Sequence, residues 1–579
     1  MKIRLRRLNQ IVIISLAILG IRLFSLQIIR GERYARLSDR NRIRKIILTA
    51  PRGRIFDRNG IPLADTRPSW TIAVIPTETN DSALSFLSAI LKIPMPELRR
   101  RLEPIAAFPS PVNICRDVSF KIVAQIEENN FRLPGVMTRV DPVRNYPYGP
   151  IYAHCIGYIG EITDAELARD TSYHRLDYIG KTGIEARYEK RLRGADGTQF
   201  VEVDVRGREI GPLPEKRVQS PISGNDIYLT INHRLQQLAY ELSKPYERSA
   251  VVGIAIRTGE ILCLISNPAF DPNLFLSHLN SARWDSLVSN PAKPFFNRVI
   301  SAAYPPGSTF KPLIALLALE KQLITPQTNF IPCNGGFRYG NRTFRCWSAH
   351  GHLNLIEAIE QSCNSYFYQI GLRLNVDTLS KFCRRLKLDQ PSYIDIPGEK
   401  IGNVPSREFL NRRYGKGKWT QGVMLNLAIG QGELTLTPLQ LALLYACIAN
   451  DGTYFQPYLV DRIESAGTVI YTANPKQVKV ELNSSQLKII KTALTRVVEY
   501  GTARGAQLPE ISIAGKTGTA QNPPKPDHAW FVGYAPAEDP EVVFAVILEN
   551  AGQGGAAAAP IVSALVRSYF LSKNSYAQD

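Results

Sequence analysis

The chain has 579 residues, more than one hydrophobic core usually holds, so we expect two or three domains. Its formal net charge of +19 would suit nucleic acid, anionic lipid or an anionic polymer, but the basic residues lie in short clusters without a nucleic-acid-binding motif, so we expect no nucleic-acid partner. Eight cysteines in this length do not make a disulfide scaffold.

The N-terminus predicts a membrane anchor. Residues 1–10 form a basic tail, and the apolar segment 11–30 is long enough to span a bilayer as a helix. No small-x-small cleavage site follows, which favours an uncleaved anchor over a signal peptide. We therefore expect a single-pass protein with its N-terminus in the cytoplasm. Arg22 is costly at bilayer depth, so it should either reach the interface or face a membrane partner.

Residues 31–215 predict a separate domain, because they are polar and irregular. Asn59-Gly60 marks a turn between two of its strands. A Pro/Gly-rich passage, assigned to residues 216–225, predicts a linker to the rest of the chain.

Residues 226–570 predict an α+β domain, an antiparallel sheet with helices on both faces, followed by a tail at 571–579. The order of a hairpin, then helices, then three strands is the basis of this prediction. The expected elements are a helix from near His233, a hairpin of residues 251–256 and 261–265, and strands at 511–514, 531–534 and 542–548.

The stretch Tyr304-Pro305-Pro306-Gly307-Ser308-Thr309-Phe310-Lys311 leads into a helix that is apolar on nearly every side. Ser308 stands at the helix N-terminus, and Lys311 lies three positions later on the same face, so its amine can reach the Ser308 hydroxyl. The free N–H groups of this helix end favour negative charge, as acyl transfer requires. An ordinary capped helix with a surface lysine is the alternative, because S-x-x-K is frequent by chance.

Two further motifs follow in the order that a serine acyltransferase would need. Ser362-Cys363-Asn364 places a second hydroxyl and an amide beside the nucleophile. Gly515-Lys516-Thr517-Gly518-Thr519 comes at the end of the expected 511–514 strand. A strand edge with this composition offers a cation and hydroxyls to a substrate carboxylate.

With these motifs the chain resembles the class B penicillin-binding proteins, the peptidoglycan D,D-transpeptidases. The wording at 304–311 and 515–520 is close to that of the family, and a run near the start of 31–215 resembles its non-catalytic pedestal. The resemblance implies a penicillin-recognising serine transpeptidase fold, a β-rich pedestal that docks partners, and a place in the bacterial cytoplasmic (inner) membrane with the catalytic domain outside. A second K-T-G, at 181–183, resembles a structural motif of the pedestal.

The resemblance also implies a mechanism. Ser308 would attack a D-Ala-D-Ala stem peptide and form an acyl-enzyme that an amine resolves, and β-lactams would acylate the same serine. Lys311 would act as base, and we expect burial and the Lys516 charge to lower its pKa. The implied catalytic residues are Ser308, Lys311, Ser362, Asn364 and Lys516, and the implied substrate-binding residues are Thr517, Gly518, Thr519 and Trp530.

A cluster spaced C-x₁₂-C-x₃-H-x₁₂-C is formed by Cys333, Cys346, His350 and Cys363. Three thiolates and an imidazole suit one structural tetrahedral zinc, with His352 as a fallback ligand. A Cys333–Cys346 disulfide and unpaired buried thiols are the alternatives. The resemblance supports the metal, because elongation-type relatives have a histidine thirteen residues before the cysteine of S-C-N. The chemistry itself would need no cofactor.

Other functions remain open at this point. A serine β-lactamase would use the same motifs, and residues 408–411 resemble E-x-x-L-N one residue short, but an anchor and a pedestal do not suit a small secreted hydrolase. A β-lactam sensor or scaffold without turnover would keep the fold. Within the family, the sequence of the pedestal and the cysteine-bearing loop favour the side-wall elongation type over the division type. Its expected partner is a polytopic membrane glycosyltransferase of the shape machinery.

Overall fold

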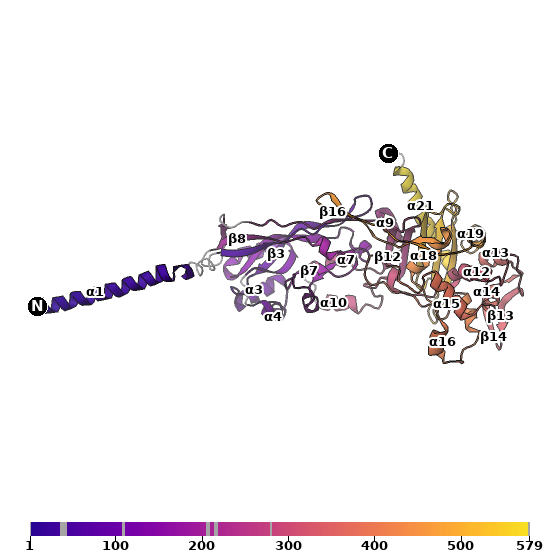
Figure 1. Cartoon of the computed structure of the whole chain (residues 1–579), viewed down its shortest axis with the longest axis horizontal. Coiled ribbons are helices and arrows are strands. Elements are labelled where there is room, and N and C mark those ends of the chain that lie inside the picture. The colour runs from indigo at the N-terminus through magenta and orange to yellow at the C-terminus, as the bar shows by residue number, and fades with distance from the viewer. Residues whose placement is uncertain are drawn as a thin grey trace. The chain divides into compact units, whose positions relative to one another are not determined.

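The computed structural model describes residues 2–34, 43–106, 110–203, 209–213, 218–277 and 281–576 (Figure 1). The chain folds into two compact units. The first unit comprises Met1–Arg52, Thr66–Val143 and Arg193–Gly224, and the second comprises Gly53–Asp65, Arg144–Leu192 and Asn225–Asp579. Two segments that the sequence groups with the pedestal therefore fold with the transpeptidase part.

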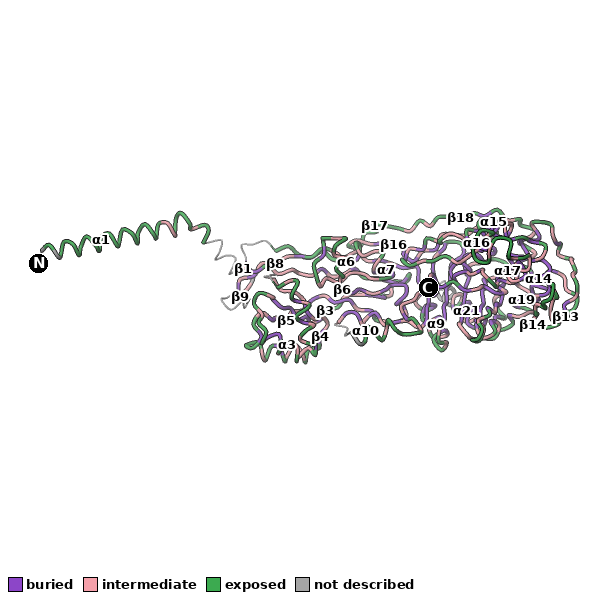
Figure 2. The backbone as a smooth tube through the Cα atoms, turned by 90° about the horizontal axis from the view of Figure 1, so that it is seen from below, coloured by how far each residue is buried: buried purple, intermediate pink, exposed green. Residues whose placement is uncertain are grey.

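The N-terminal helix fits a membrane anchor. Helix α1 (Lys2–Phe24) continues into a π-helical turn at Ser25–Ile29. Every residue of α1 whose burial is described is exposed (Figure 2). The apolar window Leu5–Ile29 has 25 residues. At a rise of about 1.5 Å per residue it is roughly 38 Å long, enough to cross a hydrocarbon layer of about 30 Å. A second apolar window, Gly554–Leu571, has 18 residues, but half of it is buried in the fold, as in a core helix.

Besides α1, the described residues of the first unit form sheets and three further α-helices. One sheet has the strand order β1-β8-β9, and in another β3 pairs with β4 and β5. The elements are β1 (Ile43–Leu48), β3 (Pro62–Val74, whose first four residues belong to the second unit), α3 (Asp81–Leu91), α4 (Met95–Leu102), β4 (Val112–Val118), α5 (Phe120–Glu128), β5 (Val136–Asn145), β8 (Gly197–Val203) and β9 (Glu209–Pro212).

A five-stranded antiparallel sheet of order β12-β11-β21-β20-β19 forms the centre of the second unit. Four of its strands are buried at every residue, which explains their continuous apolar sequences and requires helices on both faces. The strands are β11 (Ser249–Ala255), β12 (Ile261–Asn267), β19 (Ala514–Ala520), β20 (His528–Ala535) and β21 (Val542–Leu548).

Helices α9 (His233–Ser243) and α21 (Ala559–Tyr576) contact one another and the sheet. Helix α18 (Pro438–Ala449) also packs on the sheet, and α12 (Lys311–Glu320) is buried at every residue but its last. The other helices of this unit are α6 (Asp164–Leu167), α7 (Gly183–Arg187), α8 (Glu189–Leu192), α10 (Ser281–Val288), α11 (Arg298–Ser301), α13 (Leu355–Glu360), α14 (Asn364–Gly371), α15 (Val376–Arg385), α16 (Arg407–Tyr414), α17 (Val423–Ala428), α19 (Ser484–Glu499) and α20 (Gly554–Ala557).

Smaller sheets and hairpins complete the second unit. Strands β13 and β14 form a hairpin, β16 pairs with β17 and β10, and β10 also pairs with β2. The bounds of the remaining strands are β2 (Ile55–Phe56), β6 (Ile159–Glu161), β7 (Tyr178–Gly180), β10 (Asp226–Leu229), β13 (Cys333–Tyr339), β14 (Arg342–Gly351), β15 (Thr453–Phe455), β16 (Val460–Ser465), β17 (Thr468–Thr472) and β18 (Gln477–Lys479).

Two expectations about elements need correction. The strand expected at 511–514 begins only at Ala514 and continues to Ala520, because pairing with β20 fixes its extent. The linker expected at 216–225 is not a free spacer. Gln219 and Ile222 form β-bridges with Thr198 and Ala195, while residues 214–217 lie outside the described part of the chain.

Candidate active site

The nucleophile candidate Ser308 lies in a 3₁₀ turn, Gly307–Phe310, that leads into α12, so the predicted helix N-terminus is confirmed. Gly307 has a φ of +56°, and a Cβ there would lie 2.7 Å from Thr519 O. Its N–H donates to Gly430 O at 2.9 Å. Only glycine fits this position, because the turn is pressed against the K-T-G-T strand.

Lys311 is fully buried beside the S-x-N motif. Its Nζ donates to Ser362 O and Asn364 Oδ1, both at 2.7 Å, and to Ser362 Oγ at 3.3 Å. These three acceptors use all three protons of an ammonium group. Within the described residues, Ser308 Oγ makes no hydrogen bond, so the expected contact between Lys311 Nζ and Ser308 Oγ is not formed in this structure.

The S-x-N motif owes its geometry to the end of α13. Ser362 has a φ of +54°, and it follows the helix where glycine usually stands. The bonds Ser362 N to Ile359 O and Cys363 N to Ala358 O close the helix in a Schellman motif. This turn lets the main-chain carbonyl and the hydroxyl of Ser362 both reach Lys311.

Burial lowers the pKa of Lys311 to about 8, against an opposing effect of three nearby cysteine thiols. Lys516 is also fully buried, and burial and then the Lys311 charge lower its pKa well below the usual range. Burial thus acts on Lys311 as expected. The Lys311 charge lowers the pKa of Lys516, whereas the expected lowering of the Lys311 pKa by the Lys516 charge is not found.

The K-T-G-T residues lie on β19, which is an edge strand of the central sheet as predicted. Gly518 faces the nucleophile turn, because a Cβ there would lie 2.8 Å from Thr309 Cγ2. Thr517 Oγ1 lies 2.6 Å from Thr502 Oγ1, in the loop after α19. Gln431 Nε2 donates to Thr519 O at 3.0 Å. Gln431 belongs to Gly430-Gln431-Gly432, a segment that matches the family pattern and that we interpret as scaffold. No sequence motif marks Thr502.

The prediction that Trp530 lines the groove is wrong. Its side chain is 0% exposed, and its Nε1 donates to Pro305 O at 3.2 Å. It lies on β20 opposite Gly518, where the missing side chain of the glycine leaves room for the indole. Trp530 therefore supports the approach to Ser308 from within the core.

Comparisons with known proteins agree with this geometry. Residues 249–567 match the penicillin-binding protein transpeptidase domain, and residues 47–229 match the penicillin-binding protein dimerisation domain. The peptidoglycan D,D-transpeptidase MrdA of Acinetobacter baumannii is 36% identical over 575 residues, covering 95% of this chain and 84% of the relative.

Solved structures give the same result. A complex of penicillin-binding protein PBP2 with MreC from Helicobacter pylori has a TM-score of 0.77 at 27% identity, covering 91% of this chain and 99% of that chain. A structure described as the coordination of polymerization and crosslinking by a peptidoglycan synthase complex has a TM-score of 0.71 at 29% identity, covering 98% of both chains. The chain belongs to the class B penicillin-binding proteins of the elongation type.

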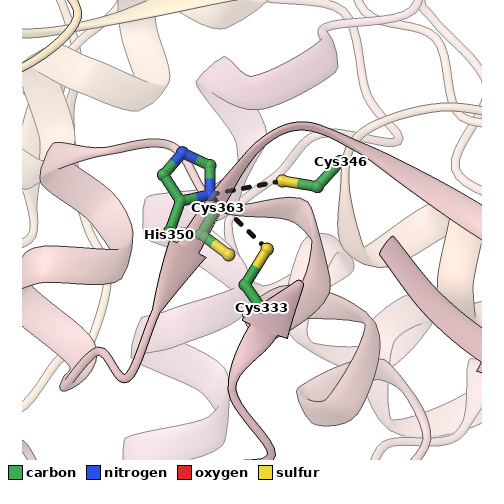
Figure 3. A group of neighbouring side chains, drawn as sticks. All are labelled: Cys333, Cys346, His350 and Cys363. Atoms are coloured by element: carbon green, nitrogen blue, oxygen red, sulfur yellow. Dashed lines mark hydrogen bonds between the residues drawn. The ribbon is translucent and has the colours of Figure 1, made fainter. Parts of the chain in front are cut away.

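A second cluster in this penicillin-binding protein lies next to the S-x-N motif. The side chains of Cys333, Cys346, His350 and Cys363 point toward one another, with four candidate ligand atoms within 4.8 Å of one another (Figure 3). His350 Nδ1 lies 3.5 Å from both Cys333 Sγ and Cys346 Sγ. Cys333, Cys346 and Cys363 are not in disulfides, so the structure contains no Cys333–Cys346 disulfide. The predicted cluster is thus assembled and could hold a metal ion, without the fallback residue His352.

The K-T-G at 181–183 of this penicillin-binding protein has a different environment. Lys181 Nζ is paired with Glu166 Oε2 at 2.6 Å. A Cβ on Gly183 would lie 2.5 Å from Cys155 O, so this glycine is needed for close packing. These contacts agree with a structural role.

Proposed function

We propose that this penicillin-binding protein cross-links peptidoglycan stem peptides during cell-wall elongation, through an acyl-enzyme on Ser308. Its D,D-transpeptidase activity is that of its named relatives. The observation that carries the residue assignment is the buried Lys311, bound to both members of the S-x-N motif and one turn from Ser308.

Lys311 acts as the base in its neutral form. A neutral amine has two protons and one lone pair, so the short bonds to Ser362 O and Asn364 Oδ1 use both protons. The lone pair is then free to accept a proton from Ser308 when substrate brings the hydroxyl into line, or from Ser362 Oγ at 3.3 Å. Ser362 relays the proton to the leaving amine, while Asn364 holds Lys311.

The K-T-G-T strand binds the terminal carboxylate of the stem peptide through Thr517 and Thr519. Lys516 supplies positive potential, and the arriving carboxylate raises its pKa because opposite charges favour the charged form. Backbone N–H groups of Ser308 and Thr519 form the oxyanion hole, a device worth about 10²–10³ in rate per donor.

Covalent labelling by a fluorescent penicillin tests the nucleophile. Ser308→Ala should abolish labelling of folded protein, while the matched variant Ser301→Ala, seven residues earlier, should label normally. Labelling that persists in Ser308→Ala would exclude Ser308.

We also propose that the Cys333, Cys346, His350 and Cys363 cluster holds one structural zinc ion. Zinc bonds of about 2.3 Å to sulfur and 2.0–2.1 Å to nitrogen in a tetrahedron place these atoms about 3.6 Å apart. The observed sulfur–nitrogen separations are 3.5 Å. Asn364 N donates to Cys346 Sγ at 3.2 Å, so the ion would tie the β13–β14 hairpin to the S-x-N turn.

Metal analysis of the purified full chain tests this site. We expect one zinc per chain, lost in Cys333→Ser and retained in Cys383→Ser, which alters another fully buried thiol. Zinc-free native protein, or equal zinc in both variants, would contradict the assignment.

The proposed topology places residues 1–10 in the cytoplasm and the catalytic domain outside. The apolar α1 and the basic N-terminus support this orientation. A polytopic membrane glycosyltransferase is the proposed partner, by analogy with the similar synthase complex.

A further inference from the structure

A buried polar network, which the proposed chemistry does not use, lies behind the nucleophile. Its centre is Glu549, immediately after β21, whose side chain is 13% exposed. Its Oε1 accepts hydrogen bonds from Tyr304 Oη at 2.7 Å and from Arg298 Nε at 3.1 Å. Arg248 Nη1 lies 3.6 Å from Oε2. The carboxylate is thus held by two arginines and offers one oxygen to the tyrosine.

Tyr304 is firmly placed. Its N–H and C=O exchange hydrogen bonds with Leu436 at 2.9 and 2.8 Å. Its ring meets Trp530 and His528 edge-on, with centroids 6.0 and 5.7 Å apart. The hydrogen bond from Tyr304 Oη to Glu549 fixes the tip of the side chain. The backbone and the hydroxyl of Tyr304 are therefore both held in place.

The backbone between Tyr304 and Ser308 has little conformational freedom. Pro305 and Pro306 have φ fixed by their rings, and Pro305 O accepts from Trp530 Nε1 at 3.2 Å. The following Gly307 is pressed against Thr519. With so few free torsions between them, a displaced Tyr304 displaces Ser308.

We propose that Glu549 is a positioning residue for the nucleophile, acting through the Tyr304 hydroxyl to hold the Ser308 turn in line with Lys311. This inference rests on Ser308 being the nucleophile. A charged acceptor suits the task, because a hydrogen bond to a carboxylate is shorter and stronger than one to a neutral group. Misplacement of a reacting group by about 1 Å can cost on the order of 100-fold in rate.

The test is pre-steady-state acylation of the full chain by a fluorescent penicillin, with the active fraction taken from the labelling end point. Tyr304→Phe should lower the acylation rate constant about tenfold. This factor corresponds to the lower end of the free energy that one hydrogen bond to a charged group contributes. The dissociation constant before acylation and the midpoint of the pH profile should not move, since Lys311 and the carboxylate site are untouched. A merely structural role would reduce the active fraction and leave the rate constant of active molecules unchanged.

Two further variants separate positioning from stability. Glu549→Leu removes the Tyr304 bond and both arginine contacts, so it should be at least as slow as Tyr304→Phe. The double variant should be no slower than Glu549→Leu, because the Tyr304 hydroxyl acts only through Glu549. Glu549→Gln retains an acceptor and should recover most of the rate. The matched control is Tyr146→Phe. It removes the hydrogen bond that Tyr146 Oη donates to Glu185 Oε1 at 3.1 Å and the one that it accepts from Ile159 N at 3.2 Å. Glu185, like Glu549, is paired with an arginine. It should acylate at the parental rate.

Parental acylation by Tyr304→Phe, additive effects in the double variant, or equal slowing in Tyr146→Phe would overturn the inference. Ser308→Ala is measured in parallel. Labelling of Ser308→Ala would refute the proposed nucleophile itself, whereas an unlabelled Ser308→Ala with a fast Tyr304→Phe would refute only the role of Glu549.

Discussion

At the scale of the residue, Lys311 illustrates how burial changes the chemistry of a side chain. A surface lysine is charged at neutral pH, but burial lowers the pKa of Lys311 to about 8. The base form is the deprotonated one, so it accumulates as the pH rises through this value. We predict that the acylation rate constant increases with pH between about 6.5 and about 9 and then levels off. Stopped-flow acylation by a chromogenic cephalosporin checks this, and a rate that is flat or falls over this range would contradict it.

The same argument predicts that Lys311→Arg is inactive at every pH in this range. A guanidinium group stays protonated in proteins and has no lone pair to offer. The variant keeps the positive charge, so loss of acylation with retained folding separates a base from a purely electrostatic role. Thermal unfolding of both proteins provides the folding control.

Motif spacing predicted which residues meet at this site, but contacts set by the fold could not be predicted. The three motifs place Lys311 beside Ser362 as expected. The resemblance, by contrast, assigns Trp530 to the groove, whereas its side chain is fully buried and donates a hydrogen bond to Pro305 O. Thr502 bonds to Thr517 across fifteen positions, which no local pattern predicts. Side-chain direction depends on strand register, and register is a property of the paired strands.

At the scale of the element, the K-T-G-T strand shows where sequence periodicity fails. The alternation at 511–514 predicts a strand over these residues with K-T-G-T at its end, but β19 runs from Ala514 to Ala520. The glycines and the lysine of this segment have low strand propensity, and pairing with β20 outweighs it. The hairpin of β11 and β12 and the start of α9 were predicted correctly, because apolar runs, a turn and a capping residue mark them locally.

The packing of elements around Ser308 gives a further prediction. Gly430 has a φ of +71°, and a Cβ there would lie 2.1 Å from Gly307 O. Gly430→Ala should displace the nucleophile turn and lower the acylation rate constant by at least about tenfold. Gly417 has a matching φ of +73° with open space around its Cβ position. Gly417→Ala therefore carries only the backbone strain, about 1–2 kcal/mol, and should acylate normally.

Equal acylation by the two alanine variants would show that backbone strain alone is being measured. Slower acylation only in Gly430→Ala, with a fully labelled end point, would show that the turn is displaced in folded protein.

At the scale of the whole molecule, the charged residue Arg22 lies within the apolar window of the proposed anchor α1. Arg22 lies seven residues before the end of the apolar window Leu5–Ile29, about 10 Å along the helix axis. Its side chain is exposed within the described structure. A charge near bilayer depth costs about 2.5–3.5 kcal/mol on insertion scales. The cost is met either by extension of the side chain to the interface or by a polar group on a neighbouring membrane helix.

These two solutions make opposite predictions for Arg22→Leu. If Arg22 reaches the interface, leucine only makes α1 more apolar, and a co-expressed membrane glycosyltransferase should co-purify unchanged. If Arg22 meets a polar group of the partner, leucine leaves that group unpaired in hydrocarbon, and recovery of the partner should fall at least about tenfold. We expect the second result, because α1 continues beyond Arg22 as one helix and keeps this residue inside the apolar window. Gln27→Leu, a polar-to-apolar change nearer the end of the same window, should leave the complex intact, and normal recovery with Arg22→Leu would leave the proposed partner contact without support from α1.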